Sequence, residues 1–167
     1  MLCIRIVFAL SVILASHYWK DYDGEVPMDA ISAGTDKEGK PVYVGQIYMK
    51  DHGLLPATIV PEANFTFTAT GSKVIQTNKD IKILCSIDGG LKWLSTKAAE
   101  ERSCSFVNGG AKLSVKKWKT LYIGRANYQG ETKVGQIFPD YRELYIPYNG
   151  EEAHLRSYEI LSYNCIN

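Results

Sequence analysis

The sequence predicts an all-β protein made of two tandem antiparallel β repeats, related by an approximate twofold axis and packed as one domain. Three observations lead to this prediction: an internal repeat, an alternation of apolar and polar residues with period two, and a composition rich in tyrosine. Tyr occurs 11 times in 167 residues, and aromatic side chains pack well on the half-buried surface of a sheet. A chain of this length is expected to form one core rather than two.

The internal repeat relates two halves of the chain at a nearly constant offset. The segment Val42-Tyr43-Val44-Gly45 is echoed by Leu121-Tyr122-Ile123-Gly124, so that Gly124 follows Gly45 by 79 positions (124 − 45). Gly150 also follows Gly71 by 79 positions (150 − 71). Two copies are too few for an open solenoid, so each copy is expected to bury its apolar face against the other. The expected organisation is a leader at residues 1–16, a first repeat at 17–92 and a second repeat at 93–167.

The alternation predicts where the strands lie in each repeat. Expected strands are residues 42–44, 57–60, 64–69 and 81–87 in the first repeat, and 121–126, 134–138, 143–147 and 157–163 in the second. Turn residues such as Gln129-Gly130 and Asn149-Gly150 separate them, and a short helical turn is expected at 96–102. Residues 114–119 include three more residues than the matching part of the first repeat. They predict a longer hairpin tip or, alternatively, an aromatic and cationic surface for an anionic glycan or headgroup.

Residues 1–16 have the features of a secretory signal peptide. Arg5 gives a short positive start, and a mostly apolar run from Ile6 to Ala15 follows, with small residues at the expected cleavage point. The run is far shorter than the roughly 20 residues of a membrane span, so we expect no membrane span and a secreted, extracellular protein. The sequon Asn64-Phe65-Thr66 predicts a glycoprotein with glycan on Asn64.

Three cysteines remain once Cys3 leaves with the leader: Cys85, Cys104 and Cys165. In an oxidising compartment an odd count allows one disulfide and one thiol, or an intermolecular pair, and so leaves a homodimer open. Cys85 and Cys104 close the shortest loop, which makes their pairing the least costly in chain entropy.

Composition and motifs argue against several function classes. The formal net charge of +1 gives no long-range field for nucleic acid. His17, His52 and His154 lie apart in the sequence without metal-ligand spacing, and no nucleophile motif accompanies them. We therefore expect a non-enzymatic protein with no catalytic residue, metal or cofactor.

Several motifs together resemble the DM-nine repeat. The first copy shows Ala33-Gly34-x-Asp36 followed by the segment 42–45, and the second shows Tyr145-Ile146-Pro147-Tyr148-Asn149-Gly150-x-Glu152 followed by Tyr158-Glu159-Ile160-Leu161. The resemblance implies a two-repeat all-β module. Several members of that family bind mannose-type sugars and act in innate recognition, so a lectin-like role is implied here.

The resemblance also implies where a sugar would bind. In that family an aspartate and a lysine hold the sugar, as a hydrogen-bond acceptor and donor for its hydroxyls. The matching residues are Asp36 and Thr58 in the first repeat, and Lys112 and Gln136 in the second. Asp36 is equally compatible with an Asx-type turn ahead of Gly39. The leading hypothesis is a secreted carbohydrate-binding module; the alternative is a degenerate lectin fold that contacts a protein partner.

Overall fold

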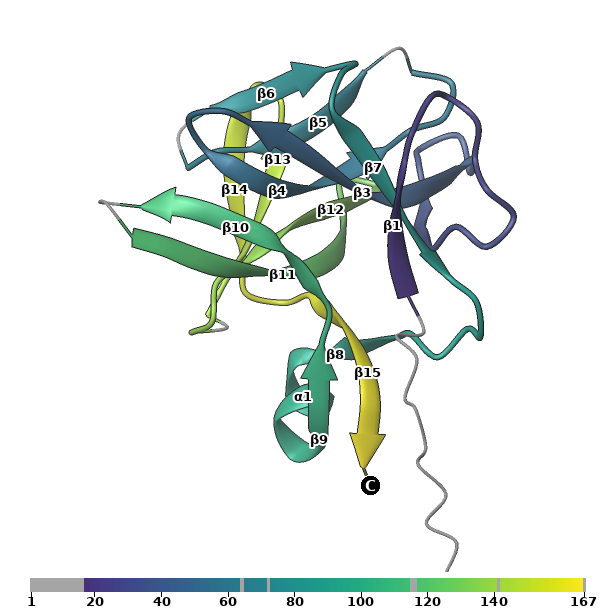
Figure 1. Cartoon of the computed structure of the whole chain (residues 1–167). Coiled ribbons are helices and arrows are strands. Elements are labelled where there is room, and N and C mark those ends of the chain that lie inside the picture. The colour runs from purple at the N-terminus through teal and green to yellow at the C-terminus, as the bar shows by residue number, and fades with distance from the viewer. Residues whose placement is uncertain (1–16, 64, 72, 115–116, 141, 167) are drawn as a thin grey trace, which may run out of the picture.

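The computed structural model describes residues 17–63, 65–71, 73–114, 117–140 and 142–166. The strands are β1 (His17–Asp21), β2 (Ser32–Thr35), β3 (Pro41–Met49), β4 (Gly53–Ile59), β5 (Thr66–Ala69), β6 (Val74–Thr77), β7 (Ile81–Ser86), β8 (Lys92–Ser95), β9 (Ser103–Phe106), β10 (Asn108–Ser114), β11 (Lys117–Tyr128), β12 (Glu131–Ile137), β13 (Leu144–Tyr148), β14 (Glu151–Leu155) and β15 (Glu159–Ile166). They form a hydrogen-bonded network whose main path runs β1-β7-β3-β4-β10-β11-β12-β13-β14 (Figure 1). The predicted all-β fold is confirmed.

Strand register repeats between the two halves of the chain. In the first half Gly45 pairs with Ile83 and Phe67 pairs with Gln76; in the second half Gly124 pairs with Ile160 and Tyr145 pairs with His154. By this register β1 to β7 correspond in order to β8, β10, β11, β12, β13, β14 and β15. The fold is therefore two copies of one β motif, as the internal repeat predicts, while the division between residues 92 and 93 stays a prediction.

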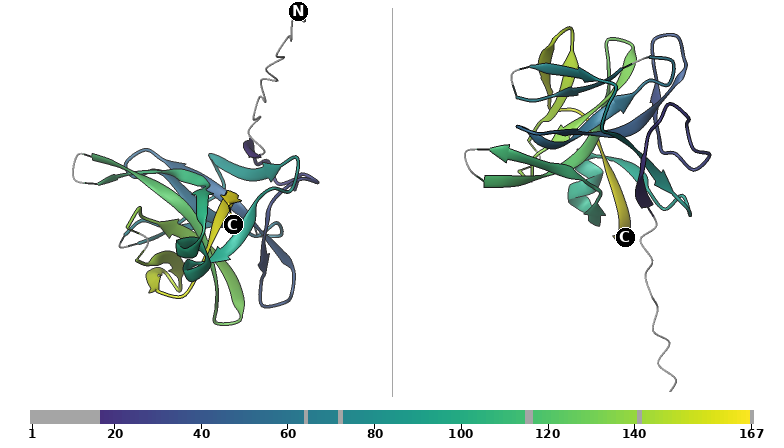
Figure 2. Two further views of the ribbon diagram at one scale, coloured as in Figure 1. Left: turned by 90° about the horizontal axis from the view of Figure 1, so that it is seen from below. Right: turned by 45° about the horizontal axis from the view of Figure 1, so that its top comes forward.

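The two copies are joined by reciprocal contacts. Leu54 and Gly53 on β4 pair with Ala111 and Lys112 on β10. On the opposite side, the equivalent strands β12 and β2 meet where the Thr35 backbone N–H donates to Thr132 Oγ1 at 3.2 Å. The hairpins β5–β6 and β13–β14 lie next to each other at the top of the molecule (Figure 1 and the right view of Figure 2). Each copy thus covers part of the other.

The core has three clusters that follow the repeat. One cluster combines both copies and contains Ala33, Val42, Val44, Leu84, Val107, Ile123, Val134 and Leu161, with Trp19 and Trp93 packed against it. A second cluster, around Ile47, Ile59 and Ile83, belongs to the first copy. A third, around Ile137, Ile146 and Ile160, belongs to the second. Burial of an aliphatic side chain stabilises by about 1.5–3 kcal/mol, so the shared cluster helps to hold the two copies together.

The predicted helical turn is confirmed as α1 (Thr96–Glu101). Ser95 precedes it in an extended conformation, and its hydroxyl oxygen accepts a hydrogen bond from the Ala98 backbone N–H at 3.2 Å. This N-cap satisfies one of the helix's otherwise unpaired donors. In the part of the chain that the structure describes, no helix is long and apolar enough to cross a membrane.

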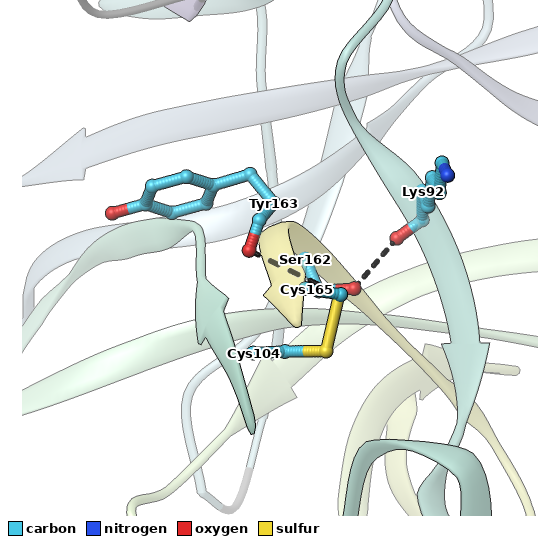
Figure 3. The surroundings of a disulfide bond; sticks show 5 residues. All are labelled: Lys92, Cys104, Ser162, Tyr163 and Cys165. Carbon is cyan, nitrogen blue, oxygen red and sulfur yellow. Dashed lines mark hydrogen bonds between the residues drawn. A yellow bond between two sulfur atoms is a disulfide. The ribbon is translucent and has the colours of Figure 1, made fainter. Parts of the chain in front are cut away.

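The disulfide joins Cys104 to Cys165 (Figure 3). Cys85 is a buried free thiol. The predicted pairing of Cys85 with Cys104 is wrong. Cys104 lies on β9 and Cys165 on β15, and these strands pair, which brings the two Cα atoms to 4.1 Å. Cys85 lies on β7 inside the first copy's cluster. Loop length describes only the unfolded chain, whereas strand pairing decides which sulfurs meet.

The longer hairpin predicted at residues 114–119 is formed by β10 and β11, with Leu113 opposite Trp118. Residues 115 and 116 lie outside the described residues, as do Asn64 and the leader 1–16. The Trp118 side chain is 63% exposed.

Candidate functional site

Thr58 lies inside the molecule. It is 3% exposed on β4, and its hydroxyl joins the two copies: Oγ1 accepts from the Val134 backbone N–H at 2.8 Å and donates to the Val134 carbonyl at 3.3 Å. A buried hydroxyl that satisfies a backbone N–H in this way has a structural role. The side chain does not face solvent, where a ligand would arrive.

Asp36 forms the turn between β2 and β3. Its carboxylate accepts from the backbone N–H groups of Glu38 at 3.0 Å and Lys40 at 2.8 Å. These bonds are those of an Asx turn, the alternative that the sequence left open. Thr58 lies opposite Val44, in the interior of β3, whereas this turn precedes the start of β3. The two side chains therefore serve separate local structures.

Lys112 and Gln136, the second-copy counterparts, are brought together around Glu152. The Gln136 amide nitrogen donates to the Ala69 carbonyl at 3.2 Å and to Glu152 Oε2 at 3.4 Å, while Gln136 Oε1 is buried without a hydrogen-bond partner among the described residues. Burial lowers the pKa of Lys112, and the negative charge of Glu152 partly offsets this. Glu152 also accepts from the Gly71 backbone N–H at 2.7 Å.

His154 completes this cluster. Its Nε2 lies 3.2 Å from Glu152 Oε1, and its ring packs on Tyr145 with centroids 4.5 Å apart. Among the described residues, no group of His, Cys, Asp and Glu side chains is arranged to hold a metal ion. The polar side chains of this cluster thus contact one another.

An open pocket lies between the copies at the place that the internal repeat makes equivalent to this cluster. We call it the charged pocket; it has a volume of about 380 Å³ and is lined by Phe67, Val74, Gln76, Glu131, Lys133, Pro147, Tyr148, Asn149 and Gly150. By strand register Gln76 corresponds to His154, and Val74 corresponds to Glu152. Val74 and Gln76 do not form a contact like the one between the Glu152 carboxylate and the His154 ring, which leaves this side open.

The charges of this pocket come from β12. Lys133 Nζ lies 3.1 Å from Glu131 Oε2, and Lys37 Nζ lies 3.8 Å from Glu131 Oε1. The Glu131 and Lys133 side chains are 19% and 20% exposed, so solvent reaches them but does not surround them. Residues two apart on a strand lie on the same face, which places both groups in the pocket. The pair supplies an acceptor and a donor side by side.

Aromatic side chains and a tight turn form the rest of the charged pocket. Phe67 comes from β5 of the first copy, and Tyr148 from β13 of the second. The Tyr148 ring is held edge-on against Tyr128, with centroids 4.8 Å apart. Asn149 and Gly150 both have positive φ, 47° and 83°, as a two-residue hairpin turn requires. The pocket is thus a site between copies, with apolar walls and one ion pair.

Sequence reasoning missed Glu131, Lys133 and Glu152. Glu131 and Lys133 stand at alternate positions directly after the Gln129-Gly130 turn, which is a signal that both share one face of a strand. Nothing in the sequence indicates that β5 and β6 of the other copy lie opposite that face.

The fold defines a class: two-copy, all-β modules, here with an opening between the copies. The family model for the DM9 repeat matches residues 47–155 and 114–166. The chain belongs to the DM9 repeat family, which confirms the resemblance noted from its motifs. The family and the fold point to a non-catalytic recognition module. Comparison with curated proteins gives no match.

Among solved structures, the crystal structure of the nematode sperm cell motility protein MFP2B is similar, with a TM-score of 0.62 and 17% sequence identity. The alignment covers 87% of this chain and 45% of that chain, so this chain spans less than half the length of the nematode protein. At this identity the likeness shows the fold alone.

Proposed function

We propose that the module recognises carbohydrate and that a mannose-type hexose binds in the charged pocket. The observation that carries the proposal is the Lys133–Glu131 pair, with 3.1 Å between Nζ and Oε2, in a pocket walled by Phe67 and Tyr148. A carboxylate accepts from sugar hydroxyls, an ammonium donates to them, and aromatic walls suit the C–H faces of a pyranose. A carboxylate and an ammonium thus lie together here, whereas Asp36 and Thr58 form a turn and a buried contact.

The size of the pocket also suits this ligand. About 380 Å³ lies at the small end of the range for ligand pockets, which fits one or two sugar rings rather than a folded partner. A single hexose with few contacts binds weakly, so useful avidity requires several copies of the sugar or of the module.

Titration of methyl α-D-mannopyranoside, followed by NMR, tests the proposal. We expect weak binding to the wild type and at least about fivefold weaker binding to Glu131→Gln and to Lys133→Met, because each exchange loses a charge-assisted hydrogen bond. Lys79→Met and Glu101→Gln make the same chemical changes at exposed positions outside the pocket and should bind like the wild type. Absence of binding by the wild type, or equal binding by all variants, would reject the pocket.

We also propose that the module acts outside the cell. The Cys104–Cys165 disulfide supports this, because such bonds persist in oxidising compartments. Secreted protein should begin near Ser16 or His17. Glycosidase treatment should lower its mass by removing the glycan on Asn64. A protein that keeps Met1, or one without that mass change, contradicts the respective half of the proposal.

A further inference from the structure

A second opening lies between the copies, and we call it the aromatic groove. It has a volume of about 660 Å³ and shares no lining residue with the charged pocket. The side chains that define it are Trp19, Gln46, Tyr48, Asn108, Trp118 and Thr120. Trp118 is 63% exposed and Tyr48 55% exposed, which is unusual for such large apolar rings.

The same place in the other half of the molecule is closed by the chain's own side chains. There the Arg125 guanidinium lies over the Trp93 ring, 4.5 Å from its centroid, and Arg125 Nε donates to Glu159 Oε2 at 2.7 Å. Arg125 pairs across the strands with Glu159 as Gln46 pairs with Lys82, so Gln46 stands where Arg125 stands. This arrangement shows that a flat polar group fits on the tryptophan face at this position.

In the first half, Gln46 does not cover the Trp19 ring as Arg125 covers the Trp93 ring. Its amide donates to the Gly109 carbonyl at 2.8 Å, and the shorter side chain ends without a planar cation to cover the ring. The longer β10–β11 hairpin then adds Trp118, for which the shorter β2–β3 turn has no counterpart. The groove is therefore built from two features that distinguish the first half from the second.

The charges around the groove specify the kind of ligand. The position equivalent to Glu159 is Lys82, which pairs with Asp21 at 2.5 Å, so a bound cation would lack the counter-ion that Arg125 has. Among the described residues that line the groove there is no Asp, Glu, Lys or Arg. Burial lowers the pKa of the His17 imidazole at one end of the groove below its ordinary value of 6.5, which favours the neutral form.

We propose that the aromatic groove is a second binding site, for a neutral oligosaccharide whose pyranose ring stacks on Trp19 and Trp118. The exposed polar side chains Asn108 and Thr120 are placed to meet its hydroxyls. Neutral rings with apolar faces and hydroxyl edges match aromatic walls interspersed with amides and hydroxyls. This site does not depend on the charged pocket.

Titration of mannotriose, followed on the indole N–H signals of the three tryptophans, tests the groove. We expect the signals of Trp19 and Trp118 to shift and that of Trp93, which Arg125 covers, to stay in place. Trp118→Ala should weaken binding about tenfold, whereas Phe65→Ala, which removes an exposed ring elsewhere, should not. The double variant Glu131→Gln/Lys133→Met should keep the Trp19 and Trp118 shifts, which separates this site from the charged pocket.

A second variant closes the groove instead of truncating it. The double variant Gln46→Arg/Lys82→Glu reproduces the Arg125–Glu159 pair and should abolish the Trp19 shift, while an unchanged Trp93 signal shows that the fold is retained. The proposal is overturned if mannotriose shifts neither signal, if Trp118→Ala and the closed variant bind like the wild type, or if choline competes for the groove.

Discussion

Gly34 and Gly110 lie at two equivalent points where the copies approach each other closely. A Cβ atom on Gly34 would lie 2.2 Å from Thr132 Oγ1, and one on Gly110 would lie 2.1 Å from the Leu54 carbonyl oxygen. Both residues have positive φ, 144° and 133°, where glycine is favoured. Glycine therefore allows each copy to approach the other closely at these two points.

Exchange of these glycines should reveal the cost of that approach. Gly110→Ala should lower the free energy of unfolding by about 3 kcal/mol or more, because backbone strain adds to a clash with a fixed carbonyl. Gly34→Ala should cost less, because the atoms it meets belong to the Thr132 side chain, with Oγ1 at 2.2 Å and Cβ at 2.9 Å, rather than to a backbone carbonyl. Gly130→Ala, with φ of 84° and no neighbour within 4 Å, is the control and should cost about 1 kcal/mol. Urea unfolding measures the free energy of unfolding of all three variants. Equal losses in the three would show that contact with the other copy does not add to the cost.

Loss of the Thr58 hydroxyl should weaken the contact between the copies. Thr58→Val keeps the shape but leaves the Val134 N–H unpaired, so we expect a loss of about 2 kcal/mol. Thr58→Ser keeps the hydroxyl and should lose about 1 kcal/mol for the missing methyl group. Hydrogen exchange at the Val134 amide should speed up in the first variant relative to the second. Equal exchange would show that the hydroxyl does not protect this amide.

Removal of the disulfide should destabilise the second copy. Cys104 and Cys165 are separated by 61 residues, and opening a loop of that length costs about 4 kcal/mol in the chain-entropy description. Cys104→Ser should therefore lower the unfolding midpoint in urea.

In a chain that begins at His17, the Cys85 thiol should react with iodoacetamide only after unfolding, since it is fully buried. Rapid labelling of the native protein would contradict that burial.

Lys112 should make stability depend on pH in the alkaline range. Burial lowers the pKa of Lys112 from its ordinary value of 10.5, so the folded state disfavours the charged form. The cost is present below the folded pKa and disappears as the pH rises toward 10.5. Lys112→Met should thus be more stable than the wild type at pH 7, and the difference should shrink by pH 10. A difference in stability that stays the same between pH 7 and pH 10 would show that the charge of Lys112 is not its cause. The control Lys79→Met, the same exchange at an exposed position, should show no difference from the wild type.

Much of the fold could be predicted because both copies repeat one local pattern. The alternation in 42–44 and 121–126 reflects strands with one face in the core, and the Gln129-Gly130 and Asn149-Gly150 turns have the positive φ that such hairpins need. Short edge strands such as β1 and β8 were missed because half-exposed residues alternate weakly.

The candidate site could not be predicted because it depends on contacts between copies. Thr58 occupies the family's lysine position, yet the face it lies on is covered by Val134 of the other copy. Glu131 and Lys133 form a pocket only with Phe67 on a strand 64 residues earlier (131 − 67). The spacing of residues along the chain does not indicate that these side chains come together in the fold.

The position of β15 determines the order in which the molecule can assemble. This strand pairs with β8, β9 and β11, so none of those pairings can form on the ribosome until synthesis has reached residues 159–166. The strands β1 to β7 have all been made by Ser86. A nascent chain can therefore pair the strands of its first copy during translation, while its second copy still lacks β15 and Cys104 still lacks its partner Cys165. Ribosome-bound chains stopped before Glu159 should accordingly be the form that chaperones and disulfide-forming enzymes bind.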